Sequence, residues 1–182
     1  MKTLRHLCCL IFSAVLALAA LPSPAEPSLA VGELAPHFSG HDQDGRKWDL
    51  SHYTGKRYVL VYFFPADDTI GGATEASGLS DNLFEFKQAG VEVVGVSSEN
   101  RKSQRHFTFK YNVAFPLLAD TRRRIADAYG ARMDGDNKLD RRISFLIGLD
   151  GRILRINKSP DPVSQLKEMA IAVAQLSRKD SL

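Results

Sequence analysis

A buried strand, a polar turn and the start of a helix form the segment of this sequence whose pattern indicates chemistry. Residues 58–64 read YVLVYFF, an apolar run typical of a strand buried on both faces of an α/β sheet. Pro65 ends the run, residues 66–72 form a polar turn, and residues 73–88 are predicted to form a helix. Backbone N–H groups converge where such a turn meets a helix start, at the edge of the sheet where ligands bind. The segment is therefore suited to hold an anion or to stabilise a thiolate.

The residues of this turn resemble the active-site loop of one known family. Pro65 and Thr69 match the Pro-x-x-x-Thr-x-x-Cys motif of peroxiredoxins of the alkyl hydroperoxide reductase/thiol-specific antioxidant (AhpC/TSA) superfamily, especially its bacterioferritin-comigratory (Q-type) class. In this resemblance Gly72 stands at the position of the peroxidatic cysteine. Ser77 stands where many Q-type members carry the resolving cysteine, and Glu75 matches the family's glutamate three residues after the peroxidatic cysteine. The chain thus looks like a peroxiredoxin without its reactive sulfur.

The resemblance extends to an arginine far along the chain. Arg142 precedes the run Ile-Ser-Phe-Leu-Ile, which matches the family's Arg-x-[Ser/Thr]-Phe-x-Ile context. In the family, this arginine and the helix dipole make the thiolate reactive, and the threonine hydroxyl hydrogen-bonds in the same pocket. Two interpretations are open. Thr69, Gly72 and Arg142 can form an anion-binding pocket, or Arg142 and Thr69 only satisfy buried backbone groups and Glu75.

Cysteine is confined to the beginning of the sequence. Cys8 and Cys9 are its only cysteines, in a segment with the basic start, apolar run and small-residue ending of a secretory signal peptide. We expect a signal peptide over residues 1–25, cleaved after Ala25, a linker over residues 26–30, and a secreted or periplasmic location. The alternative is an uncleaved membrane anchor, for which the apolar run is short, since a span needs ~20 residues. The predicted mature chain has no thiolate for catalysis.

Composition argues against several other partners. Removal of residues 1–25 takes two of the 24 basic residues and none of the 21 acidic ones, so the charges nearly balance. This balance gives no reason to expect a nucleic acid or a membrane surface as partner of the cleaved chain. His37 and His41 lack the further ligands of a zinc site, and no phosphate-binding loop is present, so we expect neither metal nor cofactor. The run at residues 122–124, three arginines, is expected to form a solvated face.

The remaining segments predict a single α/β domain over residues 31–182. A turn at residues 42–45 indicates an N-terminal hairpin, and a turn at residues 149–151 indicates a second one. The other predicted strands and helices are, in chain order, a strand at 91–96, a helix at 101–110, a strand at 115–118, a helix from Asp120 to Ala128, strands at 143–147 and 152–156, and a helix after Asp161. Together with the family resemblance, which covers roughly residues 31–177, this order predicts a thioredoxin-like fold of the peroxiredoxin type. Its central mixed sheet is flanked by helices and carries the N-terminal hairpin as an extension.

Two functional hypotheses follow. In the first, the chain is an exported peroxiredoxin homologue that works by binding, with a small anion or peroxide as ligand, or with a partner protein or a second copy. In the second, it keeps the antioxidant, thioredoxin-dependent type of peroxidase function of the family and relies on sulfur supplied by a partner or a thiol reductant. Whether the chain is an enzyme therefore depends on a sulfur that residues 26–182 do not contain.

Overall fold

The computed structural model describes residues 29–65, 70–133 and 140–179. The predicted signal peptide, most of the predicted linker and Thr69 lie outside these ranges. No helix among the described residues combines the length and the apolar character needed to cross a membrane.

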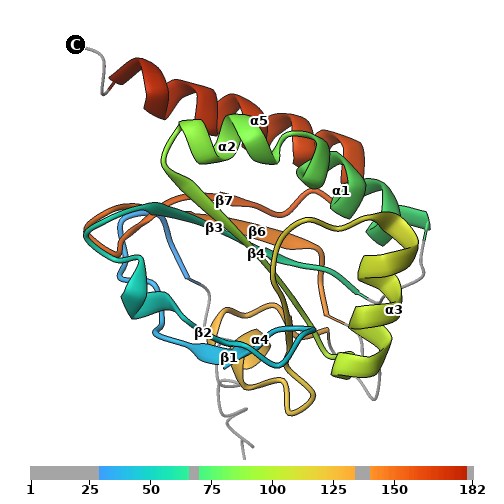
Figure 1. Cartoon of the computed structure of the whole chain (residues 1–182). Helices are drawn as coiled ribbons and strands as arrows, with labels where there is room; N and C mark the ends of the chain where they lie inside the picture. The colour runs from blue at the N-terminus through green and yellow to red at the C-terminus, as the bar shows by residue number, and fades with distance from the viewer. Residues whose placement is uncertain (1–28, 66–69, 134–139, 180–182) are drawn as a thin grey trace, which may run out of the picture.

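A five-stranded mixed sheet in the order β5-β4-β3-β6-β7 forms the centre of the fold (Figure 1). Its strands are β3 (Tyr58–Phe63), β4 (Val91–Ser97), β5 (Leu117–Ala119), β6 (Ile143–Ile147) and β7 (Ile153–Asn157). β3, β4 and β5 are parallel, whereas β6 runs antiparallel to β3 and β7 antiparallel to β6. The apolar run predicted to be the buried strand is β3, the middle strand of the sheet.

Helices cover one face of the sheet, and the N-terminal hairpin with one short helix covers the other (Figure 1). The first face packs against α1 (Ile70–Asp81), α2 (Leu83–Gln88), α3 (Arg101–Tyr111) and α5 (Pro162–Lys179). The second face packs against α4 (Arg124–Ala128), the short 3-10 helix η1 (Leu50–His52) and the hairpin of β1 (Ser39–His41) and β2 (Lys47–Asp49). The predicted α/β fold with an N-terminal hairpin extension is confirmed.

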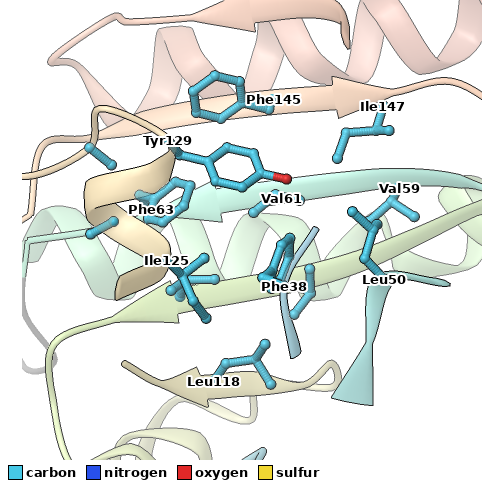
Figure 2. Close-up of a cluster of buried hydrophobic side chains, with 14 of the residues drawn as sticks. Phe38, Leu50, Val59, Val61, Phe63, Leu118, Ile125, Tyr129, Phe145 and Ile147 are labelled. Atoms are coloured by element: carbon cyan, nitrogen blue, oxygen red, sulfur yellow. The ribbon is translucent and has the colours of Figure 1, made fainter. Parts of the chain in front are cut away.

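Alternate side chains of β3 enter two separate hydrophobic clusters. Val59, Val61 and Phe63 point into the cluster shown in Figure 2, where Tyr129 and Phe145 also lie. The intervening side chains of β3 belong to the cluster under α1, α3 and α5. Because both faces of β3 are buried, the strand needs apolar residues at every position, and this explains its unbroken apolar sequence.

Two predicted helices differ in the structure. The single helix expected at residues 73–88 begins at Ile70 and divides into α1 and α2 at Asn82, whose backbone leaves the helical conformation (φ −94°, ψ 6°). The Nδ2 atom of Asn82 donates a hydrogen bond to the carbonyl oxygen of Gly78 at 2.8 Å, so the side chain competes with the backbone for this acceptor. Asp120 caps α4 as predicted, since its carboxylate accepts the backbone N–H groups of Arg124, Ile125 and Ala126, but it does so from a turn, and the regular helix begins only at Arg124.

The prediction of a solvated face at residues 122–124 is wrong for the middle arginine. The Arg123 side chain is buried, and its Nη2 atom lies 2.8 Å from Oδ1 of the buried Asp140. Arg122 and Arg124 are exposed. Arg123 also has a positive φ of 56°, so its backbone turns just before α4 and directs its side chain away from those of its neighbours.

Candidate functional site

A buried ion pair joins two of the residues predicted to form the site. The guanidinium of Arg142 donates a hydrogen bond through Nη1 to Oε2 of Glu75, and the two side chains are 9% and 2% exposed. The topology explains how residues so far apart in sequence meet. Ile143, at the start of β6, pairs with Phe63 at the end of β3, and α1 follows β3 in the chain. Arg142 therefore lies beside the beginning of α1.

The same guanidinium lies against the backbone in the first turn of α1. A Cβ atom placed on Gly71 would lie 3.0 Å from Nη2 of Arg142 and 3.3 Å from Cγ of Pro162. The absence of a side chain at Gly71 lets the arginine approach this closely. Gly72, the next residue, is buried in the same turn. The first turn of α1 contains no acidic side chain. The positive charge of Arg142 and the positive end of the helix dipole therefore both contribute to a positive potential there.

The charge of this region depends on the protonation of Glu75. Burial raises the pKa of the Glu75 carboxyl to about 8, although the neighbouring Arg142 favours its ionised form. A raised pKa keeps a larger share of Glu75 protonated near neutral pH than is usual for a glutamate. In those molecules the positive charge of Arg142 is not neutralised, so the start of α1 can attract an anion.

A cavity of about 530 Å³ adjoins this pair. It is lined by two of the predicted site residues, Pro65 and Arg142, and by two further basic residues, Arg141 and Lys158. Its apolar lining comes from Leu29, Tyr129, Met133, Ile143, Phe145 and Pro160. Among the described lining residues the one carboxylate is Asp140, which is bound to Arg123. An apolar hollow with basic side chains is complementary to a ligand that combines an apolar body with a negative charge.

Comparison with known proteins agrees with this architecture. The model of the AhpC/TSA family matches residues 31–156. The chain belongs to this family. Among its relatives, peroxiredoxin Bcp of Escherichia coli K12 is 39% identical over 134 residues, which cover 69% of this chain and 83% of that protein. Peroxiredoxin Q of Oryza sativa (chloroplastic) is 37% identical over 139 residues, which cover 73% of this chain but only 64% of that protein.

Solved structures of AhpC/TSA-related proteins share the fold. Peroxidoxin BcpB of Mycobacterium tuberculosis superposes with a TM-score of 0.73 at 26% identity, covering 80% of this chain and 96% of that one. The bacterioferritin comigratory protein of Xanthomonas campestris superposes with a TM-score of 0.71 at 24% identity, covering 77% of this chain and 92% of that one. The predicted family and the predicted thioredoxin-like architecture of the peroxiredoxin type are therefore confirmed.

The structure places the predicted site residues of this AhpC/TSA member as follows. It brings Arg142 into contact with Glu75, as the second interpretation of the sequence expects, and it places Pro65 on the same cavity as Arg142. Ser77 is half-buried within α1. Thr69 lies outside the described residues. The anion-binding role of Thr69, Gly72 and Arg142 stays a prediction.

Sequence reasoning missed the contribution of Lys158 to the cavity. The signal was present, because the predicted hairpin turn at residues 149–151 sets the pairing of the two strands that flank it. In that pairing Ser144 lies opposite Asn157, so Lys158 comes next to the beginning of β6 and to Arg142. Within the described ranges, no group of three or more His, Cys, Asp or Glu side chains is arranged to bind a metal ion.

Proposed function

We propose that this chain is an exported AhpC/TSA family member that binds a small amphipathic ligand, either an anion such as a carboxylate or an uncharged hydroperoxide, without reducing it. The observation that carries the proposal is that residues 10–182 contain no cysteine. The chemistry of a peroxiredoxin requires a thiolate that is oxidised to a sulfenic acid, and serine cannot undergo this two-electron oxidation. Gly72, at the position of the peroxidatic cysteine, offers only its backbone.

The cavity beside Arg142 supports the choice of ligand. Its volume lies within the range of small-molecule sites, and its buried walls include the rings of Tyr129 and Phe145. Arg142 supplies a guanidinium with two parallel N–H donors on each side, which suits a carboxylate. Lys158 is exposed at the same cavity and adds a second positive charge. A ligand with an apolar chain and a single anionic head would contact both kinds of surface.

The names of the relatives favour a second candidate function, a thiol-dependent peroxidase. The Escherichia coli relative is called a peroxiredoxin, and the description of the Xanthomonas campestris structure refers to alkyl peroxide reduction. For this chain to act in the same way, a partner or a thiol reductant would have to supply the reacting sulfur. The same cavity would then hold the peroxide while the external thiol attacks it.

Calorimetric titration with octanoate tests the first candidate, with inorganic phosphate as the matched anion that has no apolar chain. We expect the full chain to bind octanoate and to bind phosphate at least about tenfold more weakly, since phosphate cannot fill the apolar part of the cavity. Lys158→Gln changes an exposed residue and should weaken octanoate binding several-fold without unfolding the protein. Arg155→Gln, an exposed arginine of β7 outside the cavity, is the control and should bind as wild type.

The same samples, mixed with cumene hydroperoxide and excess dithiothreitol, separate the two candidates. Cys8→Ser and Cys9→Ser are introduced together so that the chain contributes no thiol. Binding without hydroperoxide consumption above the dithiothreitol background supports the first candidate. Repeated turnover by this cysteine-free chain supports the second candidate and excludes the first. Absence of octanoate binding contradicts the proposed ligand.

Export is the part of the proposal that rests on residues 1–25. A basic start, an apolar run and the sequence Ser-Pro-Ala before Glu26 support cleavage after Ala25. Expression of the full chain in a bacterium followed by N-terminal sequencing of the periplasmic fraction tests it. We expect the purified protein to begin at Glu26, and recovery of an intact N-terminus in the membrane fraction would favour the anchor instead.

A further inference from the structure

A second hollow, of about 900 Å³, lies beyond the carboxyl ends of β4 and β5. These two strands are parallel, and their ends lead directly to the start of α3 and to the loop before α4. In open α/β sheets this edge is where ligands bind. Ser39, Gly40 and His41 of β1 also line the hollow, and β1 contacts β5. Within residues 29–65, 70–133 and 140–179, the hollow shares no lining residue with the cavity beside Arg142.

Three arginines, Arg101, Arg122 and Arg124, line this hollow, which we call the arginine groove. All three are exposed, and within the described part of the chain none of the three guanidiniums has a hydrogen-bond or ion-pair partner. Elsewhere in the described residues, arginines that contact a carboxylate are common: Arg46, Arg123, Arg132, Arg142 and Arg152. The arginine groove therefore concentrates positive charge that the protein leaves without a counterion.

Asp120, the one carboxylate among the lining residues that the structure describes, does not neutralise these arginines. Asp120 is only 7% exposed, and its two oxygen atoms accept hydrogen bonds from the backbone N–H groups of Arg124, Ile125 and Ala126. Its negative charge is thus directed at the start of α4. An anion that enters the groove from solvent would therefore contact the guanidiniums of the three arginines before it approached the Asp120 carboxylate.

Arg101 lies at the wall of the groove, close to the hairpin turn. A Cβ atom placed on Gly45, in the turn between β1 and β2, would lie only 2.8 Å from Nη1 of Arg101. The guanidinium therefore rests against the backbone of the hairpin turn, at a glycine whose φ of +84° disfavours any other residue.

The chemistry of the lining selects the class of ligand. Guanidiniums bind phosphate oxygens in a bidentate manner, and three of them suit an anion with more than one phosphate group. Among the described residues the lining contains no Phe, Tyr or Trp side chain, and its one aromatic ring is the imidazole of the exposed His41, which can donate a hydrogen bond to an anion. We propose that the arginine groove binds a small multivalent phosphate anion, for which inorganic pyrophosphate is the simplest probe.

The experiment is a calorimetric titration of the full chain with pyrophosphate. We expect saturable binding with one site per chain, weakened several-fold when the salt concentration is raised from 50 to 200 mM. Each of Arg101→Gln, Arg122→Gln and Arg124→Gln should weaken binding about tenfold, and the triple variant should abolish it. A charge-matched triple control is Lys56→Gln, Arg155→Gln and Lys167→Gln, three exposed residues outside the groove, which should bind as wild type.

Three outcomes would overturn the proposal. The first is absence of binding to wild type at millimolar pyrophosphate, and the second is equal loss of affinity in the groove triple variant and the charge-matched control. The third is equal affinity for citrate, which would make the site a general polyanion site instead of a phosphate site. Circular dichroism of each variant confirms folding. Octanoate titration of the groove triple variant should match wild type, so the result is independent of the cavity beside Arg142.

Discussion

The guanidinium of Arg142 donates to the carboxylate of Glu75 across 67 positions of sequence, at the first turns of α1. This pair lies where β3 ends and β6 begins, between the helix start and the cavity. When Glu75 is ionised, its negative charge neutralises the positive charge of Arg142. When Glu75 is protonated, the positive charge of Arg142 is not neutralised. The protonation of one buried glutamate thus sets the charge that a ligand meets.

Anion binding should weaken as Glu75 ionises. Burial raises the pKa of Glu75 to about 8, so the fraction of ionised Glu75 grows between pH 6.5 and 9. Over this range octanoate stays ionised, and the net charge at Arg142 falls. We expect the affinity for octanoate to drop about tenfold across the range, measured by calorimetry in buffers of matched ionic strength.

Glu75→Gln provides the matched variant for this pH dependence. It removes the titrating group and keeps a side chain of similar size that can accept a hydrogen bond from Arg142. We expect affinity that is at least as high as that of wild type at pH 6.5 and constant up to pH 9. The same decline in Glu75→Gln as in wild type would assign the titration to another group.

Asp140→Asn should be strongly destabilising, because it leaves the charge of Arg123 buried without its counterion. The wild-type pair is 8% and 0% exposed, and both Nε and Nη2 of Arg123 donate to Oδ1 of Asp140. Burial raises the pKa of Asp140 to about 6, so the pair is ionised at pH 7.5. Loss of one partner of a buried pair costs about 3–5 kcal/mol of unfolding free energy. Urea denaturation of wild type and Asp140→Asn at pH 7.5 measures this loss of unfolding free energy.

The control for this prediction is an exposed ion pair between the same two residue types. Arg132 contacts Asp127 at 3.1 Å, with both side chains about half exposed. Arg132→Gln should therefore cost no more than about 1 kcal/mol. Equal destabilisation by Asp140→Asn and Arg132→Gln would show that burial does not strengthen the Arg123–Asp140 pair.

Gly95→Ala should destabilise the sheet because β4 has no room for a side chain at this position. The added Cβ atom would lie 2.5 Å from Cδ2 of Leu117 and 2.9 Å from Cε1 of Tyr62, both fully buried. Overpacking of this kind costs about 1–3 kcal/mol. Gly40→Ala is the control, since its Cβ atom would meet Leu118 at 3.5 Å, an ordinary contact, and urea denaturation should show little change.

The sequence predicts those parts of the fold that local patterns determine. Apolar runs identify β3, β4 and β6 because both faces of the central strands are covered, and the Leu149-Asp150-Gly151 turn identifies the hairpin of β6 and β7. The break at Asn82 and the late start of α4 were missed. Both depend on single side-chain hydrogen bonds, to the carbonyl of Gly78 and from Asp120 to the helix start, which hydrophobic periodicity does not report.

Long-range contacts account for most of what the sequence could not predict at the site. Arg123 looks solvated within a run of three arginines, and only the folded chain shows that Asp140 lies beside it. Arg142 and Glu75 were selected through the family resemblance, since nothing in their own neighbourhoods indicates that they meet. Lys158 differs from these residues, because it reaches the cavity through the pairing of β6 with β7, which the predicted turn at residues 149–151 does indicate.

Restoring a sulfur at Gly72 should restore peroxidase chemistry if the surroundings of α1 remain suited to a thiolate. We expect Gly72→Cys, in the background of Cys8→Ser and Cys9→Ser, to consume cumene hydroperoxide with excess dithiothreitol over many turnovers. A thiol in the first turn of α1, close to the Arg142–Glu75 pair, would have a lowered pKa from the helix dipole and the arginine. Hydroperoxide loss and thiol titration against pH measure both properties.

Gly72→Ala in the same background is the steric control and should be inactive, because it adds a Cβ atom without sulfur. Peroxidase activity in Gly72→Cys but not in Gly72→Ala would mean that the helix start, Arg142 and Glu75 still form a peroxiredoxin site that lacks only its nucleophile. An inactive but folded Gly72→Cys with an ordinary thiol pKa would mean that the pair no longer activates a thiolate. Repeated hydroperoxide consumption by the Gly72→Ala control, which contains no cysteine, would contradict the premise that peroxidase activity requires a cysteine sulfur.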